Sequence, residues 1–151
     1  MHRLVVSGMI AAAIHVVTAR AGDETPSLYP GRMEPGRAIY QQYCASCHGA
    51  NAEGAPNWQV RDQHGELPAP PHDAEGHTWR HSDAELHEMV SKGWRDLFNK
   101  TKRLTMPAFG DVLSPPQIRM VITYLKTLWT PEQRQFQAEE SRGHQFPPED
   151  R

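Results

Sequence analysis

The segment Cys44-Ala45-Ser46-Cys47-His48 contains the side chains of this 151-residue chain that are best suited to chemistry. Two thiols separated by two residues, with histidine directly after them, form the attachment pattern of haem c. Each sulfur bonds to one vinyl group of the porphyrin, and the imidazole ligates the iron. The vinyl groups lie on neighbouring pyrrole rings, so the thiols must lie about one helical turn apart. The segment therefore predicts one covalently bound haem c, attached through Cys44 and Cys47, with His48 as the proximal axial ligand.

Three other roles of a close cysteine pair fit the sequence less well and stay open as alternatives. A thioredoxin-like redox pair follows a strand in a βαβ unit, whereas a helical pattern precedes this pair. A structural zinc site takes four ligands, usually from two such pairs, and the chain contains only two cysteines. A disulfide between residues this close closes a strained loop and removes little chain entropy.

Three segments have the apolar periodicity of helices and must position these groups. The first runs from Pro35 into Cys44, the second covers roughly 82 to 92, and the third follows Ser114 and ends before Pro131. The apolar stripe of the third segment consists of Ile118, Val121, Ile122, Leu125 and Leu128. No segment alternates as a half-buried strand does, so we predict an all-α protein.

Long loops separate these helices. Residues 49 to 80 are rich in Gly, Pro, Asn, Asp and His, and have no periodic segment. A loop of this length is uncommon in a compact domain unless it is functional or wraps a ligand. The hydrophobic content of 38% is modest, so we expect something besides side chains to fill the core.

From about Pro35 to Trp129 the chain resembles the class I c-type cytochromes of bacteria, which hold a single haem. The resemblance implies a cytochrome c-like, all-α fold with three main helices and long loops wrapped around one covalently bound haem. In that family a glycine and an aromatic residue, one turn apart on the first helix, let the last helix cross closely. Gly36 and Tyr40 match this pattern, and Tyr124 matches the aromatic partner on the last helix.

The same family places a methionine in the loop before the last helix as the distal axial ligand. Met106, followed by Pro107, fits that role in type and position. The remaining methionines lie in the leader, the lead-in or predicted helices: Met1, Met9, Met33, Met89 and Met120. Because the family includes bis-histidine haems, ligation by His72, His77 or His81 is the alternative.

A ligating histidine usually donates its second ring N–H to a carbonyl oxygen. In the family, a proline shortly after the haem-binding histidine supplies that carbonyl. Pro56 is the matching candidate, and its alternative role is that of an ordinary turn proline.

The loop between Trp58 and His81 is longer than in small cytochromes. We interpret it as a cover over a haem edge, with Trp58 and Trp79 against the ring and Arg80 or imidazoles near the propionates. The alternative is a second metal site, for copper, because the loop contains several histidines. The candidate ligands are His72, His77 and His81, and the part of the loop that would handle copper runs from His64 to His81.

The N-terminal residues have the pattern of a secretory signal. An apolar run of residues 4 to 17 follows two basic positions, is too short to span a bilayer, and ends at Ala19-Arg20-Ala21. The alternative is an uncleaved anchor. We expect residues 1–21 to be a signal peptide, 22–34 a flexible lead-in, 35–130 the cytochrome c domain, and 131–151 a charged, mobile C-terminal tail.

The charge balance excludes nucleic acid as a partner. Without residues 1–21, 14 basic residues stand against 18 acidic ones, a net charge of about −4. No basic block is present to neutralise phosphates.

The predicted function is that of a periplasmic, monomeric electron carrier without a membrane segment after signal cleavage. It would pass single electrons between periplasmic redox proteins, without being an enzyme itself, and could serve as a subunit of an oxidoreductase complex. One alternative is a haem protein with a displaceable sixth ligand, such as a sensor or a peroxidase-like protein. The other is a copper-handling accessory that uses residues 64–81.

Overall fold

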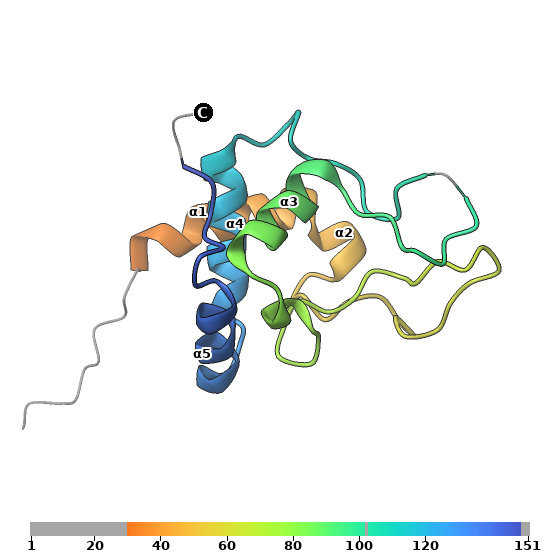
Figure 1. Ribbon diagram of the computed structural model, residues 1–151, viewed down its shortest axis with the longest axis horizontal. Helices are drawn as coiled ribbons and strands as arrows, with labels where there is room; N and C mark the ends of the chain where they lie inside the picture. Colours follow the sequence, from red (N-terminus) through yellow and green to blue (C-terminus); the bar gives the residue numbers. More distant parts are fainter. Residues whose placement is uncertain (1–29, 102, 149–151) are drawn as a thin grey trace, which may run out of the picture.

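The computed structural model describes residues 30–101 and 103–148. The elements in chain order are α1 (Pro30–Tyr43), α2 (Ala45–His48), a 3₁₀ helix η1 (Thr78–Arg80), α3 (Asp83–Lys92), α4 (Pro115–Lys126) and α5 (Pro131–Glu140) (Figure 1). Within the described residues no strand forms, and the one isolated bridge pairs Trp94 with Met106. The predicted all-α fold is confirmed. The expected signal peptide, residues 1–21, and most of the lead-in lie outside the described residues.

The crossing of α1 and α4 forms the centre of the fold. A Cβ atom on Gly36 would lie 2.3 Å from the carbonyl oxygen of Met120, so only glycine allows the two backbones to approach this closely. One turn later Tyr40 is fully buried, with its ring centroid 5.6 Å from that of Tyr124. Its hydroxyl donates to the carbonyl of Gly49 at 2.8 Å. The glycine and aromatic pattern expected at this crossing is confirmed.

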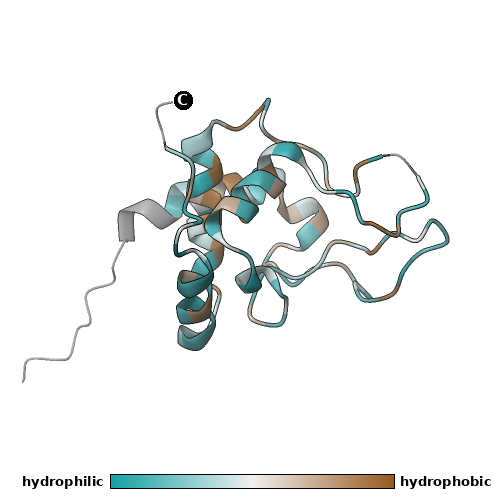
Figure 2. Ribbon diagram, viewed as in Figure 1, coloured by the Kyte–Doolittle hydropathy of each residue, from teal (hydrophilic) through white to brown (hydrophobic). Residues whose placement is uncertain are grey.

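The core lies where α1, α3 and α4 meet, and Figure 2 shows the apolar segments gathered there. Ser82 and Glu85 form the capping box that begins α3, and Ser114 with Gln117 forms the one that begins α4. The buried apolar side chains are Tyr40, Ala52, Leu86, Leu113, Ile118, Val121, Ile122, Leu125 and Trp129. They come from helices and from loop residues alike, so the loops are part of the packed core.

The beginning of α1 differs from the sequence expectation. The helix begins at Pro30, five residues before Pro35, and residues 30–34 of the expected lead-in are helical. Proline at a helix start loses no hydrogen bond, since the first N–H groups have no intrahelical acceptor. Pro35 lies inside the helix, where it removes one backbone hydrogen bond without ending the element.

The C-terminal region also differs from the expected mobile tail. Thr130 and Gln133 cap α5, and the helix is mainly hydrophilic in Figure 2. Its Gln137 is nevertheless buried, and the amide donates to the carboxylate of Asp83 at 2.7 Å. The backbone N–H of Asp83 in turn donates to the hydroxyl of Ser141 at 3.0 Å. Because α5 is held by polar contacts, the apolar periodicity of the sequence does not reveal how it docks.

Candidate haem-binding site

The cysteine pair lies at the junction of α1 and α2. The N–H groups of Cys47 and His48 both donate to the carbonyl of Cys44, at 3.1 and 3.0 Å, so the segment forms one helical turn. Neither thiol forms a disulfide; Cys44 is partly buried and Cys47 is exposed. Burial, with a smaller effect from Cys47, raises the pKa of the Cys44 thiol to about 11. The two sulfur atoms are thus available for thioether bonds one turn apart.

His48 is buried, with 7% of its surface exposed, and one hydrogen bond holds its Nδ1 edge. The Nδ1 atom lies 2.8 Å from the carbonyl oxygen of Pro70. Burial lowers the pKa of His48, an effect that the hydrogen bond to Pro70 partly opposes, and favours the neutral imidazole that binds metals. With Nδ1 donating to Pro70, the lone pair is on Nε2, which has no hydrogen bond within the described ranges.

The residue that supplies this carbonyl is Pro70, and the expectation that it would be Pro56 is therefore corrected. Pro56 is exposed in a turn that follows the hydrogen bond from Gly54 to the carbonyl of His48. Pro70 lies 22 positions after His48, beyond much of the long loop, so proximity in sequence favours the wrong proline. The run Pro68-Ala69-Pro70-Pro71 was the available signal, because successive prolines stiffen an extended segment.

His72 lies directly against His48. The two rings are stacked, with centroids 4.0 Å apart and planes 27° from parallel. Two axial ligands on opposite haem faces point at the iron along one line, and rings stacked face to face cannot do this. In this arrangement His72 is therefore not the sixth ligand. Burial holds the pKa of His72 well below its usual range, so the ring is neutral.

The other histidines of the loop do not join His72 in a metal site. The rings of His77 and His81 have centroids 5.8 Å apart, and Trp58 stacks on His77 with centroids 6.0 Å apart. Among the residues that the structure describes, no group of three or more His, Cys, Asp or Glu side chains is placed to hold a metal ion. The structure therefore does not form the second metal site considered for His72, His77 and His81.

Trp79 and Arg80 are placed against α5. The indole N–H of Trp79 donates to the carbonyl of Gly76 at 3.0 Å, and its ring meets Phe136 edge to face at 5.5 Å between centroids. The guanidinium of Arg80 lies 4.9 Å from the centroid of the Trp79 ring. Trp79 thus packs on α5, and contact of Trp79 or Arg80 with a haem edge stays a prediction.

Met106 lies in the loop between α3 and α4, and backbone contacts fix its position. Its N–H donates to the carbonyl of Trp94 at 2.9 Å, and its own carbonyl accepts from Trp94 at 3.0 Å. The chain reverses at Gly93, where two observations require glycine. Its φ of +76° lies in the left-handed region, and a Cβ atom would lie 2.7 Å from the carbonyl oxygen of Met106. Phe109 then donates to the carbonyl of Val90 at 3.0 Å. The loop is thus anchored to the end of α3.

Large apolar side chains are exposed along both long loops. The exposed fraction reaches 89% at Leu97 and 68% at Phe98. The others on these loops are Val60, Trp94 and Leu104. Leu104 lies two positions before Met106 in sequence, and Trp94 pairs with Met106 in the isolated bridge. Exposed apolar side chains mark surfaces that bind an apolar group or a partner. The two thiols, free of any disulfide, and the available Nε2 of His48 show that the residues present fit a haem.

Ion pairs join the two long loops into what we call the loop clasp, formed by Arg61, Glu66, Asp96 and Arg103. Arg103 donates to both carboxylate oxygens of Glu66, and Arg61 pairs with Asp96 at 2.9 Å. Figure 1 shows both loops extending to the same side of the helices, beyond α2. This contact was not predicted from the sequence, where the available signal is an Arg and a Glu on one loop with an Asp and an Arg on the other.

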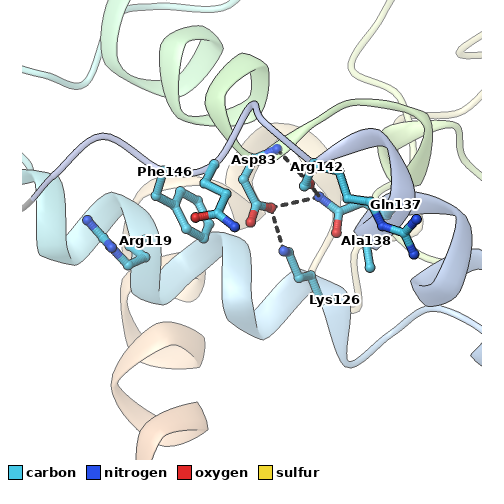
Figure 3. Close-up of a pocket in the computed structure, with 9 residues that line it drawn as sticks. Asp83, Arg119, Lys126, Gln137, Ala138, Arg142 and Phe146 are labelled. Atoms are coloured by element: carbon cyan, nitrogen blue, oxygen red, sulfur yellow. Dashed lines mark hydrogen bonds and ion pairs between the residues drawn. The ribbon is translucent and has the colours of Figure 1, made fainter.

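A separate cavity of about 330 Å³ lies between α4, α5 and the C-terminal segment (Figure 3). Asp83 accepts hydrogen bonds there from Lys126 and Gln137. None of the candidate haem-site residues lines this cavity.

Comparison with known proteins supports the chemistry of the site. The model of the family described as "Cytochrome C oxidase, cbb3-type, subunit III" matches residues 31–125. The "Cbb3-type cytochrome c oxidase subunit FixP" of Sinorhizobium medicae (strain WSM419) is 26% identical over 107 residues, which cover 68% of this chain and 32% of the relative. The chain thus spans about a third of that relative's length. No solved structure matches significantly.

Cytochrome c domains of this kind are generally extracytoplasmic. In the part of the chain that the structure covers, no helix combines the length and apolar character needed to cross a membrane. The match spans more than half of the chain and includes the attachment segment and the loop of Met106. The chain belongs to the cbb3-type cytochrome c oxidase subunit III family and is a class I c-type cytochrome, an electron-carrier domain with covalently bound haem c.

Proposed function

We propose that this protein carries single electrons between periplasmic redox partners through a haem whose iron is ligated by His48 and Met106. The observation that carries the proposal is the buried His48, held through Nδ1 by Pro70 and placed one residue after Cys47. The bound haem supplies the reversible couple between Fe(II) and Fe(III), with no substrate bond made or broken.

Each residue of the site has a distinct part in this function. Cys44 and Cys47 hold the macrocycle by thioether bonds. Pro70 orients the imidazole of His48 and raises its basicity as a ligand. Met106 offers a thioether, a weak donor that favours reduced iron, so His/Met ligation gives a higher reduction potential than two histidines. Two protein ligands close the coordination shell, and little rearrangement accompanies each electron.

The partners follow from the charge and from the relative. With residues 1–21 removed as a signal peptide, the acidic chain would be steered toward a basic patch on a periplasmic redox protein. The relative is a subunit of a cbb3-type cytochrome c oxidase by its name. We therefore include a membrane-bound oxidase complex among the partners, with this chain as a carrier to it or as one of its subunits.

The ligation is tested by visible spectra and potentiometry on protein made in a host that matures c-type cytochromes. Met106→Leu removes the thioether at nearly constant volume. It should abolish the weak red charge-transfer absorption of the sulfur–iron(III) bond and lower the midpoint potential. Met120→Leu, on α4, is the matched control and should leave both unchanged. An unaltered spectrum of the Met106 variant would exclude Met106 as the ligand.

Three further outcomes test this function against its alternatives. Cys44→Ser combined with Cys47→Ser should give haem that acid acetone extracts, since both thioethers are lost. A colourless wild-type protein would overturn the electron-carrier function. Rapid binding of carbon monoxide by the reduced wild-type protein would instead indicate a displaceable sixth ligand and a sensor or peroxidase-like role.

A further inference from the structure

His72 is fixed against the flat face of His48 from several directions. Its Nδ1 lies 2.7 Å from the hydroxyl oxygen of Thr78, which is itself buried. Its backbone N–H donates to the carbonyl of Ala52 at 2.8 Å, and its carbonyl accepts from the indole N–H of Trp129 at 2.9 Å. These contacts hold the backbone of His72 on two sides and one edge of its ring.

The hydrogen bond to Pro70 does not by itself fix the plane of the His48 imidazole. A single contact at Nδ1 fixes one edge of the ring but permits the ring to rock about the line through its two nitrogen atoms. The neighbouring ring at 4.0 Å, only 27° from parallel, blocks that motion because rocking would drive one flat face into the other. The two contacts therefore restrict different movements of the same side chain.

We propose that His72 is a positioning residue that sets the plane of the His48 imidazole, and through it the electronic structure of the haem iron. The proposal rests on ligation by His48, as given in the proposed function. The orientation of an axial imidazole determines how its π orbitals overlap with the iron d orbitals. His72 thus acts through His48 and not by binding the iron.

Substitutions of His72 and Thr78 separate the effect of a flat ring beside His48 from the effect of filling the same space. His72→Leu fills much of the space but presents no plane to His48, whereas His72→Phe keeps a flat ring and loses only the bond to Thr78. Thr78→Val leaves both imidazoles in place and removes the hydroxyl that orients His72. His77→Leu is the matched control, because His77 stacks on Trp58 and not on His48.

The readouts are the EPR g-values of the ferric protein and the NMR shifts of its haem methyl protons, which both report the plane of the axial ring. His72→Leu should change the g-values and the spread of the methyl shifts, and should shift the midpoint potential. Thr78→Val and His72→Phe both keep a flat ring and lose the bond between residues 72 and 78, so both should shift these readouts in the same direction by less. The control should match the wild type in every readout.

Two results would overturn the proposal in distinguishable ways. If the wild type has imidazole-ligated haem and both His72→Leu and Thr78→Val leave g-values and methyl shifts unchanged, His72 only fills space. If the wild-type spectra show that no imidazole binds the iron, the proposed function fails and this inference fails with it. If His72→Leu does not fold, the g-values and methyl shifts of Thr78→Val decide whether the proposal holds.

Discussion

Arg103 donates two hydrogen bonds to the carboxylate of Glu66, from Nε at 3.0 Å and from Nη2 at 2.8 Å, across 37 residues of sequence. This forked pair is the strongest geometry available to an arginine and a carboxylate. The loop of Glu66 continues to Pro70, which holds His48, and the loop of Arg103 continues to Met106. The loop clasp thus connects the segments that carry the two proposed axial ligands.

Loss of the clasp should loosen the Met106 side of the haem. Glu66→Gln removes the charge and one acceptor, so added imidazole should displace the sixth ligand at lower concentration than in the wild type. Spectrophotometric imidazole titration of the ferric protein measures this. Glu75→Gln, an exposed change in the same long loop, is the control. Equal imidazole affinity in all three proteins would show that the clasp does not affect the ligand.

The same pair gives the clasp a pH dependence. The hydrogen bonds from Arg103 hold the pKa of Glu66 below its usual range. The stabilisation is therefore complete above the usual pKa of a glutamate and is lost as the pH falls through the lowered value. Imidazole affinity of the wild type, expressed per unprotonated imidazole because imidazolium cannot bind iron, should rise over this acid range, and that of Glu66→Gln should change less. Parallel pH profiles would contradict the assignment.

Gly36→Ala should strongly destabilise the helix crossing. The added Cβ would lie 2.3 Å from the carbonyl oxygen of Met120, and a backbone atom cannot move away as a flexible side chain can. Overpacking of this kind costs about 1–3 kcal/mol of unfolding free energy. Denaturant unfolding of the holoprotein measures the change. Ala38→Ser, on the exposed side of α1, should cost much less, and equal midpoints for the two variants would refute the close crossing.

Gln137→Ala tests whether α5 docks as the structure shows (Figure 3). The substitution removes the amide that donates to Asp83 and to the hydroxyl of Ser141, at 2.7 and 2.9 Å. Asp83 and Ser141 keep other donors, Lys126 and the N–H of Asp83, so the cost is that of the lost hydrogen bonds, about 0.5–1.5 kcal/mol each. Limited proteolysis should then cut the C-terminal segment faster than in the wild type, whereas Gln135→Ala on the exposed side should not change the rate. Rapid cleavage of the wild type itself would support the mobile tail expected from the sequence.

His87 should make the protein less stable in mild acid. It is buried on α3, its Nε2 has no hydrogen-bond partner among the described residues, and burial followed by the charge of Arg119 lowers its pKa. The unfolded chain then binds the proton more readily, so stability is full above the usual histidine pKa and declines as the pH falls toward the lowered value. His87→Leu should reduce this decline between about pH 7 and 5 in thermal unfolding. The exposed His64→Gln serves as the control, and an equal decline in all three proteins would exclude His87 as the cause.

The sequence by itself determined the attachment of the haem and the main helices. The order of thiols and imidazole in Cys44 to His48 is a covalent requirement, which neighbouring residues meet without the rest of the fold. The helices α3 and α4 follow from caps and apolar periodicity, which are also local. Gly36, Tyr40 and Tyr124 were found through the family resemblance, and the structure places them at the predicted crossing.

Only the tertiary structure decided which residues surround His48 and how the loops and α5 are held. Pro70, and not Pro56, accepts the hydrogen bond from His48. The ring of His72 stacks on the His48 imidazole, and Glu66 forms an ion pair with Arg103. These contacts join residues far apart in sequence, through hydrogen bonds, ion pairs and stacked rings that leave no periodic trace. A polar residue in a loop has many possible partners, and the packing of the whole chain selects one of them.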